Sequence, residues 1–198
     1  MKQLRTRKKT TLLEKAPFLL SFFIPVLIMI GIFVQRGIFP FGDNSFLRTD
    51  MYHQYAPFFS EFRHKLLSGE SLLYSWDVGM GVNFAALYAY YLASPFNWLL
   101  LLCPSSLIIE FMTYMIVFKS GLAGLSMAWY LKKHTGSQKF GACYFGVFYA
   151  LSGYMAAYSW NIMWLDCIVL LPLILHGLER LVREKKRAFL LPDAGTFN

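Results

Sequence analysis

The stretch FLRTDMYHQYAPFFSEF, residues 46–62, gathers side chains that could do chemistry in a chain that is otherwise largely apolar. Asp50 lies close to Arg48, His53 and Gln54. A carboxylate can accept the proton of an attacking hydroxyl group or help to hold a divalent cation. His53 and Gln54 follow Asp50 by three and four positions and share its face if the segment is helical, which suits hydrogen-bonding neighbours. A solvated loop acid or a helix-capping partner is the alternative interpretation of Asp50.

Three further charged residues are candidates for the same site. Asp77 lies in the glycine-containing turn SWDVGMGVN, where it either contacts substrate or caps the turn. Asp166 adjoins an apolar segment, where an acid is costly unless it faces a cavity or a partner; it could share a cation with Asp50 or lie in interfacial water. Lys119 is near the middle of an apolar segment, a position that indicates function by default. It could bind a lipid phosphate, pair with a carboxylate on another span, or snorkel.

The composition places these residues in a membrane protein. The chain has 198 residues, of which 57% are hydrophobic and 15% charged, against about 25% charged in a typical soluble domain. The net charge of +8 does not indicate nucleic-acid binding, because the basic residues flank apolar blocks, where they orient membrane spans. The three cysteines lie in apolar surroundings without metal-binding spacing and are interpreted as packing residues. The predicted class is an all-α polytopic membrane protein.

Four transmembrane helices and one long outer loop are predicted. The first apolar run follows a basic tail, approaches the length that spans a bilayer, and is not followed by a small-residue cleavage site, so it is predicted to remain as an anchor. The predicted boundaries are a cytoplasmic tail at 1–17, spans at 18–34, 105–131, 139–158 and 161–181, an extracytoplasmic loop at 35–104, and a basic cytoplasmic tail at 182–198. The basic clusters predict that both termini lie in the cytoplasm.

The outer loop is predicted to contain helices that do not cross the membrane. If 86–104 crossed, the later basic loops would fall on inconsistent sides, so this segment is predicted to lie at the outer surface or to dip into it. Residues 57–70 predict an amphipathic helix on the membrane surface with Pro57 near its start and Gly69 as its cap. Its polar face carries Glu61, Arg63, His64 and Lys65. In the third span, a stripe of small residues predicts close helix packing: Gly146, Ala150, Gly153 and Ala157.

Several motifs in this order resemble the YfhO family of bacterial membrane proteins. They are a D-x-x-x-Q pattern at Asp50 and Gln54, a helix ending SGES, then YSWDVGMG, YYLASPFNWLLLLCP and WNIMWLDCIVLLPLILHGLE, over roughly residues 15–187. The resemblance implies a GT-C-type glycosyltransferase of the bacterial cell membrane that moves a sugar from a polyprenyl-phosphate donor to a cell-envelope polymer such as teichoic acid. It implies that Asp50, in the first outer loop, is a catalytic base or metal ligand.

The expected site follows from these residues together. Substrate is expected to contact His53, Gln54, Asp77 and Lys119, and a divalent metal ion, Mg²⁺ or Mn²⁺, is expected between Asp50 and Asp166. The expected partners are a lipid-linked sugar and membrane lipids, and no nucleic acid. Members of the family are much longer, so we expect this chain to be the N-terminal part of such an enzyme, from a truncated or out-of-frame product, and to be inactive by itself.

Two other classes of function stay open at this stage. One is a component of a lipid or solute transporter or flippase, and the other is a non-catalytic membrane scaffold. A transporter needs its key charges near the membrane midplane, whereas a lipid-dependent transferase needs them at the headgroup. Asp50, Asp77 and Asp166 are predicted at the outer surface with Lys119 alone deep, which favours the transferase.

Overall fold

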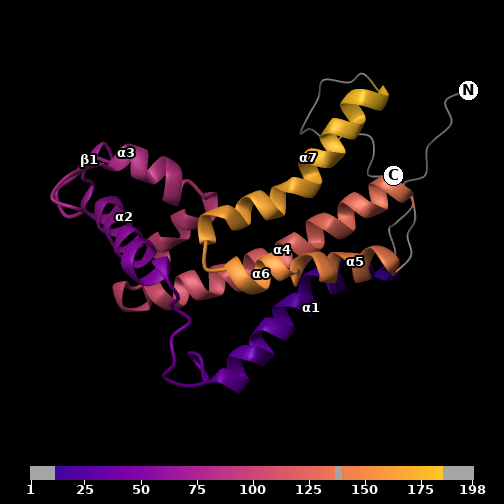
Figure 1. Cartoon of the computed structure of the whole chain (residues 1–198), viewed down its shortest axis with the longest axis horizontal. Coiled ribbons are helices and arrows are strands. Elements are labelled where there is room, and N and C mark those ends of the chain that lie inside the picture. The colour runs from indigo at the N-terminus through magenta and orange to yellow at the C-terminus, as the bar shows by residue number, and fades with distance from the viewer. Residues whose placement is uncertain (1–11, 137–139, 185–198) are drawn as a thin grey trace, which may run out of the picture.

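Long helices form a bundle, and a module of shorter elements stands at one end of it (Figure 1). The computed structural model describes residues 12–136 and 140–184. In these ranges, three segments are long and apolar enough to cross a membrane: Ala16–Arg36, Ser105–Thr135 and Ile162–Arg183. They contain helices α1 (Leu12–Arg36), α4 (Ile108–Thr135) and α7 (Leu165–Glu184), the last two preceded by short turns η4 (Ser105–Leu107) and η5 (Ile162–Trp164). The predicted all-α polytopic membrane fold is confirmed.

Helix α4 is the centre of the bundle and packs against α1, α5 (Gly141–Ala150) and α7. Its closest contact with α1 depends on two backbone features. Pro25 has no N–H to bond the carbonyl of Ser21 one turn earlier, so that carbonyl is free to face outward. It lies against Gly124, where any Cβ would collide with it, and a Cβ at Gly146 of α5 would come within 2.6 Å of the Gly124 carbonyl oxygen. The three helices therefore meet where side chains are small, as is usual between membrane helices.

The segment predicted as one span at 139–158 is two short helices. Helix α5 (Gly141–Ala150) ends at Leu151, and α6 (Gly153–Tyr158) begins after Ser152, which has an extended backbone. A helix end inside apolar surroundings leaves carbonyl groups without donors. Here the hydroxyl of Ser120 on α4 donates to the carbonyl of Ala150 at 3.2 Å. That bond from a neighbouring helix allows the chain to break at this depth.

In helix α7, too, a hydroxyl group from a neighbouring helix bonds a carbonyl that has no donor within its own helix. Pro172 leaves the carbonyl of Ile168 without its donor inside the helix. The hydroxyl of Tyr149 on α5 donates to that carbonyl at 2.7 Å. A proline within a membrane helix is tolerated when a neighbour supplies the missing donor in this way, so this bond also ties α5 to α7.

Residues 84–102 make a bent apolar segment. Helix α3 (Phe84–Leu87) continues as the π-helical turn η2 (Tyr88–Leu92) and is followed by the 3-10 helix η3 (Pro95–Leu102). The two halves meet at an angle of 103°, which is the geometry of a broken span or a re-entrant loop. The cause is Pro95, because the residue before a proline is driven to extended backbone, and Ser94 has ψ 129°. That 86–104 stays at the outer surface remains a prediction.

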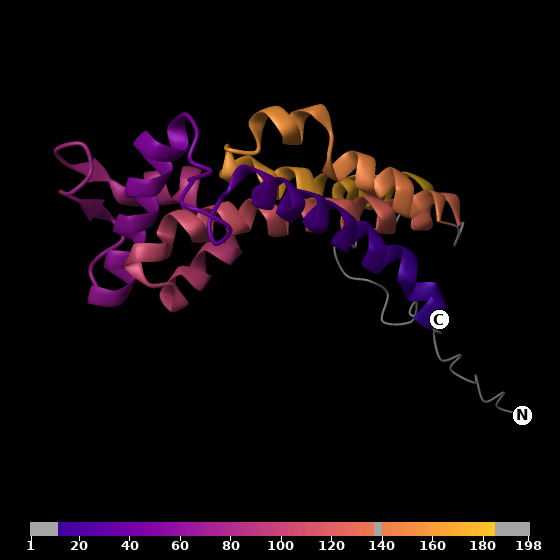
Figure 2. The ribbon, with the colours of Figure 1, turned by 90° about the horizontal axis from the view of Figure 1, so that it is seen from below.

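The outer module contains the rest of the long loop (Figure 2). The turn η1 (Met51–Tyr55) leads into α2 (Ala56–Ser68), which ends at Gly69 in the left-handed conformation, φ 71°, as predicted. Strands β1 (Tyr74–Ser75) and β2 (Val82–Asn83) pair antiparallel, with Tyr74 opposite Asn83. In α2, Arg63 Nε donates to the carbonyl of Cys103 at 2.6 Å, which fastens the helix to the end of η3.

The polar face of α2 differs from the prediction of a solvated face. Glu61 is 8% exposed and Lys65 is 4% exposed. The reason is the strand pair β1–β2, which folds back over this face and brings Ser75 against Glu61. His64 on the same helix is exposed, as expected. The helix is therefore covered on both its apolar face and part of its polar face.

One continuous apolar core joins the module to the bundle. It includes Phe59 and Phe62 of α2, Met112 and Ile116 of α4, and Leu165 of α7, all of them fully buried. Because these side chains pack together, the module is held against the outer part of α4 rather than hanging from a loop. The elements that follow α1 thus have a fixed position relative to the bundle.

Candidate functional site

Asp50 stands at the start of η1 with its carboxylate half-buried. Among the residues that the structure describes, it makes no side-chain hydrogen bond or ion pair. The preceding residue, Thr49, has φ 42°. A β-branched residue in this conformation is strained, and such strain tends to accumulate at functional sites. The backbone is therefore held in a costly shape directly before the predicted base.

A polar cluster joins η1 to two distant segments of the chain. The hydroxyl of Tyr91 donates to Gln54 Oε1 at 3.1 Å, and the hydroxyl of Tyr55 donates to Asn161 Oδ1 at 3.2 Å. The two tyrosine rings meet edge to face with centroids 5.6 Å apart. Burial raises the pKa of Tyr55 well above its ordinary value, and the nearby Tyr91 and the negative charge of Asp50 raise it further. The charge of Asp50 therefore contributes to the electrostatics of this cluster.

The predicted neighbours of Asp50 divide into two groups. Gln54 belongs to the cluster through Tyr91. His53 is exposed, and its ring packs edge-on against Tyr52 with centroids 5.1 Å apart. The segment winds as a π-helix, whose turn is wider than that of an α-helix, so the third residue after Asp50, His53, leaves the shared face, whereas the fourth, Gln54, stays close to it. Tyr91 and Asn161 were not predicted as site residues, although both lie in motifs that resemble the family, YYLASPFNWLLLLCP and WNIMWLDCIVLLPLILHGLE.

Lys119 and Asp166 form an ion pair between α4 and α7. The distance from Lys119 Nζ to Asp166 Oδ2 is 2.9 Å, and the same ammonium group donates to the carbonyl of Ile162 at 3.2 Å. Lys119 is 1% exposed, whereas the Asp166 side chain is 21% exposed. Of the three roles open to Lys119 from the sequence, the structure shows pairing with a carboxylate on another span. Its ammonium group is engaged in that pair.

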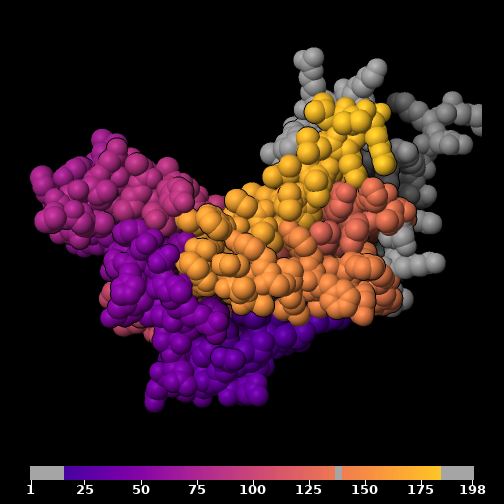
Figure 3. All heavy atoms as spheres, viewed as in Figure 1, coloured from indigo at the N-terminus to yellow at the C-terminus, as the bar shows by residue number. Residues whose placement is uncertain are grey.

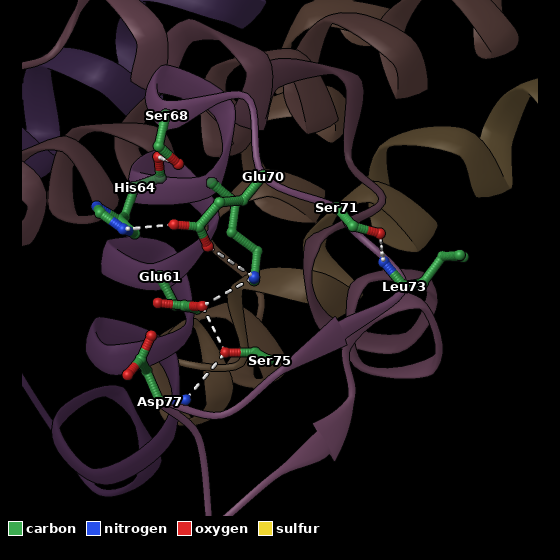
Figure 4. Close-up of polar contacts among 9 residues, drawn as sticks. Glu61, His64, Ser68, Glu70, Ser71, Leu73, Ser75 and Asp77 are labelled. Carbon is green, nitrogen blue, oxygen red and sulfur yellow. Dashed lines mark hydrogen bonds and ion pairs between the residues drawn. The ribbon is translucent and has the colours of Figure 1, made fainter.

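Asp77 belongs to a different network, at the end of the module (Figure 4). Its N–H donates to the Ser75 hydroxyl at 3.2 Å, and that hydroxyl donates to Glu61. The ammonium group of Lys65 lies 3.4 Å from Glu61 and 3.3 Å from Glu70. The hydrogen bond from Lys65 lowers the pKa of Glu70, with smaller contributions from nearby charges. This network fastens the β1–β2 turn to α2, and the exposed carboxylate of Asp77 lies at its edge.

Two hollows meet beside the strained segment. A groove of about 370 Å³ lies between α1, α4 and the break between α5 and α6, and its walls are mostly apolar. A second hollow of about 320 Å³ is lined by Asn44 and Ser45. Both are lined by Arg36, Phe46 and Arg48. In the space-filling view, the orange α5–α6 segment lies beside the purple residues that follow α1 (Figure 3).

Sequence analysis did not assign a role to Arg36, although a signal was available. Arg36 follows an apolar run on the side predicted to be extracytoplasmic, where basic residues are less frequent. An arginine in that position is therefore a candidate for a specific role. The structure places it at the junction of the two hollows, together with Arg48.

The described residues do not form a metal site of their own. Over 12–136 and 140–184, no group of three or more His, Cys, Asp or Glu residues is placed to hold a metal ion. Asp166, one of the two predicted ligands, directs a carboxylate oxygen to Lys119. The expected Mg²⁺ or Mn²⁺ ion between Asp50 and Asp166 stays a prediction, and the reaction proposed for this chain is written without a metal.

The fold and these contacts define a multi-pass, all-α membrane protein with a helical module at one end of its bundle and a polar cluster where the two meet. The family described as bacterial membrane protein YfhO matches residues 21–192, and the chain belongs to this family. A search of the curated proteins and one of the solved structures found no significant match.

Proposed function

We propose that this chain forms the outer catalytic region of a membrane glycosyltransferase. The donor is a polyprenyl-phosphate sugar and the acceptor is a cell-envelope polymer such as teichoic acid. The observation that carries the proposal is the carboxylate of Asp50, half-buried and without a hydrogen-bonding partner among the described residues, two positions from an arginine that lines both hollows. A group of this kind is free to engage a ligand.

The proposed reaction needs one base and one leaving group. The acceptor hydroxyl attacks the anomeric carbon of the sugar and loses its proton to Asp50, while the bond from that carbon to the phosphate oxygen breaks and its electron pair leaves with the polyprenyl phosphate. A positioned base of this kind typically contributes about 10²–10⁴-fold to the rate. Gln54, held by Tyr91, is placed to support Asp50 from the next turn.

The orientation proposed for the chain puts this site outside the cytoplasm. The basic residues Lys132 and Lys133 lie in the last turn of α4, and Arg183 lies in the last turn of α7. Both helices begin near the module, since Met112 of α4 and Leu165 of α7 share one core with Phe59 of α2. If basic ends face the cytoplasm, the module and Asp50 lie on the outer side, where a lipid-linked sugar is presented after it has crossed the membrane.

The pairing of Lys119 also bears on the transporter alternative. A transporter places its key charges near the midplane, at a substrate site. In the part of the chain that the structure describes, the deep cation Lys119 is neutralised by Asp166 and is nearly inaccessible. Asp50 by contrast lies in the outer module. This distribution favours transfer at the headgroup over transport through the bundle.

The test is a chimera in which these residues replace the corresponding region of a longer YfhO-family protein. Membranes containing the chimera are given a radiolabelled polyprenyl-phosphate sugar and a teichoic-acid acceptor. We expect labelled polymer from the lipid-linked donor and none from the nucleotide sugar in membranes that cannot make the lipid donor. Movement of the labelled lipid between leaflets without labelled polymer would instead support the flippase alternative.

A further inference from the structure

We propose that the two hollows joined at Arg36 and Arg48 bind the lipid carrier of the proposed reaction. The hydrocarbon chain lies in the apolar groove, the phosphate lies between the two guanidinium groups, and the sugar lies in the polar hollow. This inference rests on the proposed function and adds the residues that hold the donor.

The groove has the chemistry of a site for one hydrocarbon chain. Its walls include Ile28 and Ile32 of α1, Ile116 of α4 and Met155 of α6. Ile28 and Ile32 are 41% and 39% exposed, so the groove opens onto the lipid-facing side of α1. The polar group nearest to the break, the Ser120 hydroxyl, already donates to a carbonyl. An apolar occupant therefore does not leave the Ser120 hydroxyl unsatisfied.

The junction of the hollows has the charge of a phosphate site. Within the described ranges, neither Arg36 nor Arg48 lies within ion-pair distance of a carboxylate. The guanidinium of Arg48 lies over the ring of Phe46, 5.2 Å from its centroid, which limits its orientations. Arginine is suited to phosphate because its planar group donates two parallel hydrogen bonds. Two unpaired guanidinium groups complement one doubly or singly charged phosphate.

The polar hollow lies beyond the arginines. Asn44 is fixed at its rim, because its amide donates to the carbonyl of Arg36 at 2.8 Å. Ser45 contributes a hydroxyl to the same hollow. The order along the site is thus apolar groove, two cations, polar hollow. A single-chain lipid phosphate that carries a sugar has the same order of groups, whereas a phospholipid has two chains and a smaller headgroup.

The site also lies close to the proposed base. Asp50 follows Arg48 by two positions, so their Cα atoms are at most about 7 Å apart. Asp50 itself lines neither hollow, so the proposal requires its carboxylate to reach the bond between sugar and phosphate from the rim of the site. The arginines are therefore assigned to binding and to stabilising the leaving phosphate, and Asp50 to proton transfer.

Binding is tested with the whole chain in nanodiscs of zwitterionic lipid and with undecaprenyl phosphate as the probe. Arg36→Gln and Arg48→Gln should each weaken binding about tenfold or more, since charge-assisted hydrogen bonds are worth roughly 1.5–3 kcal/mol. Arg183→Gln, the same change at the opposite end of the bundle, should leave binding unchanged. Undecaprenol, which lacks the phosphate, should bind about tenfold or more weaker than the phosphate form.

A second variant tests the groove with both arginines intact. Ile32→Trp fills the groove and should weaken binding of the probe, whereas Leu27→Trp, at a position 65% exposed and outside the groove, should not. The inference is overturned if the double arginine variant binds within about threefold of the wild type, or if phosphatidylglycerol competes as well as the probe. If the chimera binds the probe through the two arginines but transfers no sugar, this site is upheld and the proposed function is refuted. If the chimera transfers sugar at a rate that does not change when the arginines are replaced, the proposed function is upheld and this site is refuted.

Discussion

Replacing Asp166 by Asn should destabilise the bundle more than any other single removal of a carboxylate charge in the described part of the chain. The charges of Lys119 and Asp166 are 2.9 Å apart, and at an effective dielectric constant near 20 their attraction is roughly 6 kcal/mol. Asn retains an oxygen that can accept a hydrogen bond from Lys119, so part of the attraction is kept. Breaking a buried pair by removing one partner costs about 3–5 kcal/mol, and that is the loss of unfolding free energy expected here.

The expected effects of the two partners are unequal. Lys119 is 1% exposed, so Asp166→Asn leaves an uncompensated cation with no access to water. Lys119→Met removes that cation and leaves Asp166, whose side chain is 21% exposed and so retains some contact with its surroundings. Lys119→Met should therefore cost less than Asp166→Asn, and the double variant should recover part of the loss.

The assay is unfolding of the purified chain by SDS in mixed micelles, followed by circular dichroism. Asp77→Asn is the matched control, because Asp77 is exposed at the edge of its network; it should change the unfolding free energy by no more than about 0.5 kcal/mol. The reasoning is refuted if Asp166→Asn costs less than about 1 kcal/mol, or if the double variant is no more stable than Asp166→Asn.

Three other outcomes follow from the packing and the proposed orientation. Gly124→Ala should lower the unfolding free energy by about 1–3 kcal/mol in the same assay, because its Cβ would meet the Ser21 carbonyl of α1. Gly31→Ala, whose Cβ would have nothing within 4 Å, should be tolerated, and equal effects of the two variants would contradict the close contact. Lys65→Met should speed proteolysis of the turn after α2, because it leaves a buried carboxylate without a cation, while His64→Ala should not. In a chain without native cysteines, Lys133→Cys should react with an impermeant reagent only in permeabilised cells, and labelling of intact cells would refute the proposed orientation.

Much of the bundle follows from signals that lie close together in the sequence. Apolar length and basic ends predict α1, α4 and α7, because a span must match the bilayer and its flanking charges must stay in water. Gly69 predicts the end of α2 for a similarly local reason, since glycine adopts the left-handed conformation without a steric cost.

The break between α5 and α6 could not be predicted in the same way. The sequence from 139 to 158 has no proline, and its small residues keep a regular spacing. What allows the break is a hydroxyl group from another helix, Ser120, which lies 30 positions from the carbonyl it bonds. As a consequence, the stripe of small residues packs only in its first half: Gly146 and Ala150 are buried, whereas Gly153 and Ala157 are exposed.

In the candidate site, too, local features could be predicted from the sequence and long-range contacts could not. The sequence placed Asp50 in the outer loop and offered pairing as one role for Lys119. It did not join Tyr91 to Gln54 or Asn161 to Tyr55, because these pairs are separated by 37 and 106 positions. The burial of Glu61 and Lys65 was missed for a related reason, since the strand pair that covers them follows a left-handed turn whose direction helical periodicity does not specify.

The most direct test of the proposed function is the rate of sugar transfer by the chimera with Asp50→Asn. Asn keeps the size and shape of the side chain but cannot accept the proton of the acceptor. The rate should fall about 10²–10⁴-fold, with insertion and folding unchanged, whereas Glu70→Gln, an exposed change in the Lys65 network, should transfer sugar at close to the rate of the unmodified chimera. If Asp50→Asn keeps more than about a tenth of that rate, a loss smaller than removal of a base produces, Asp50 is not the base.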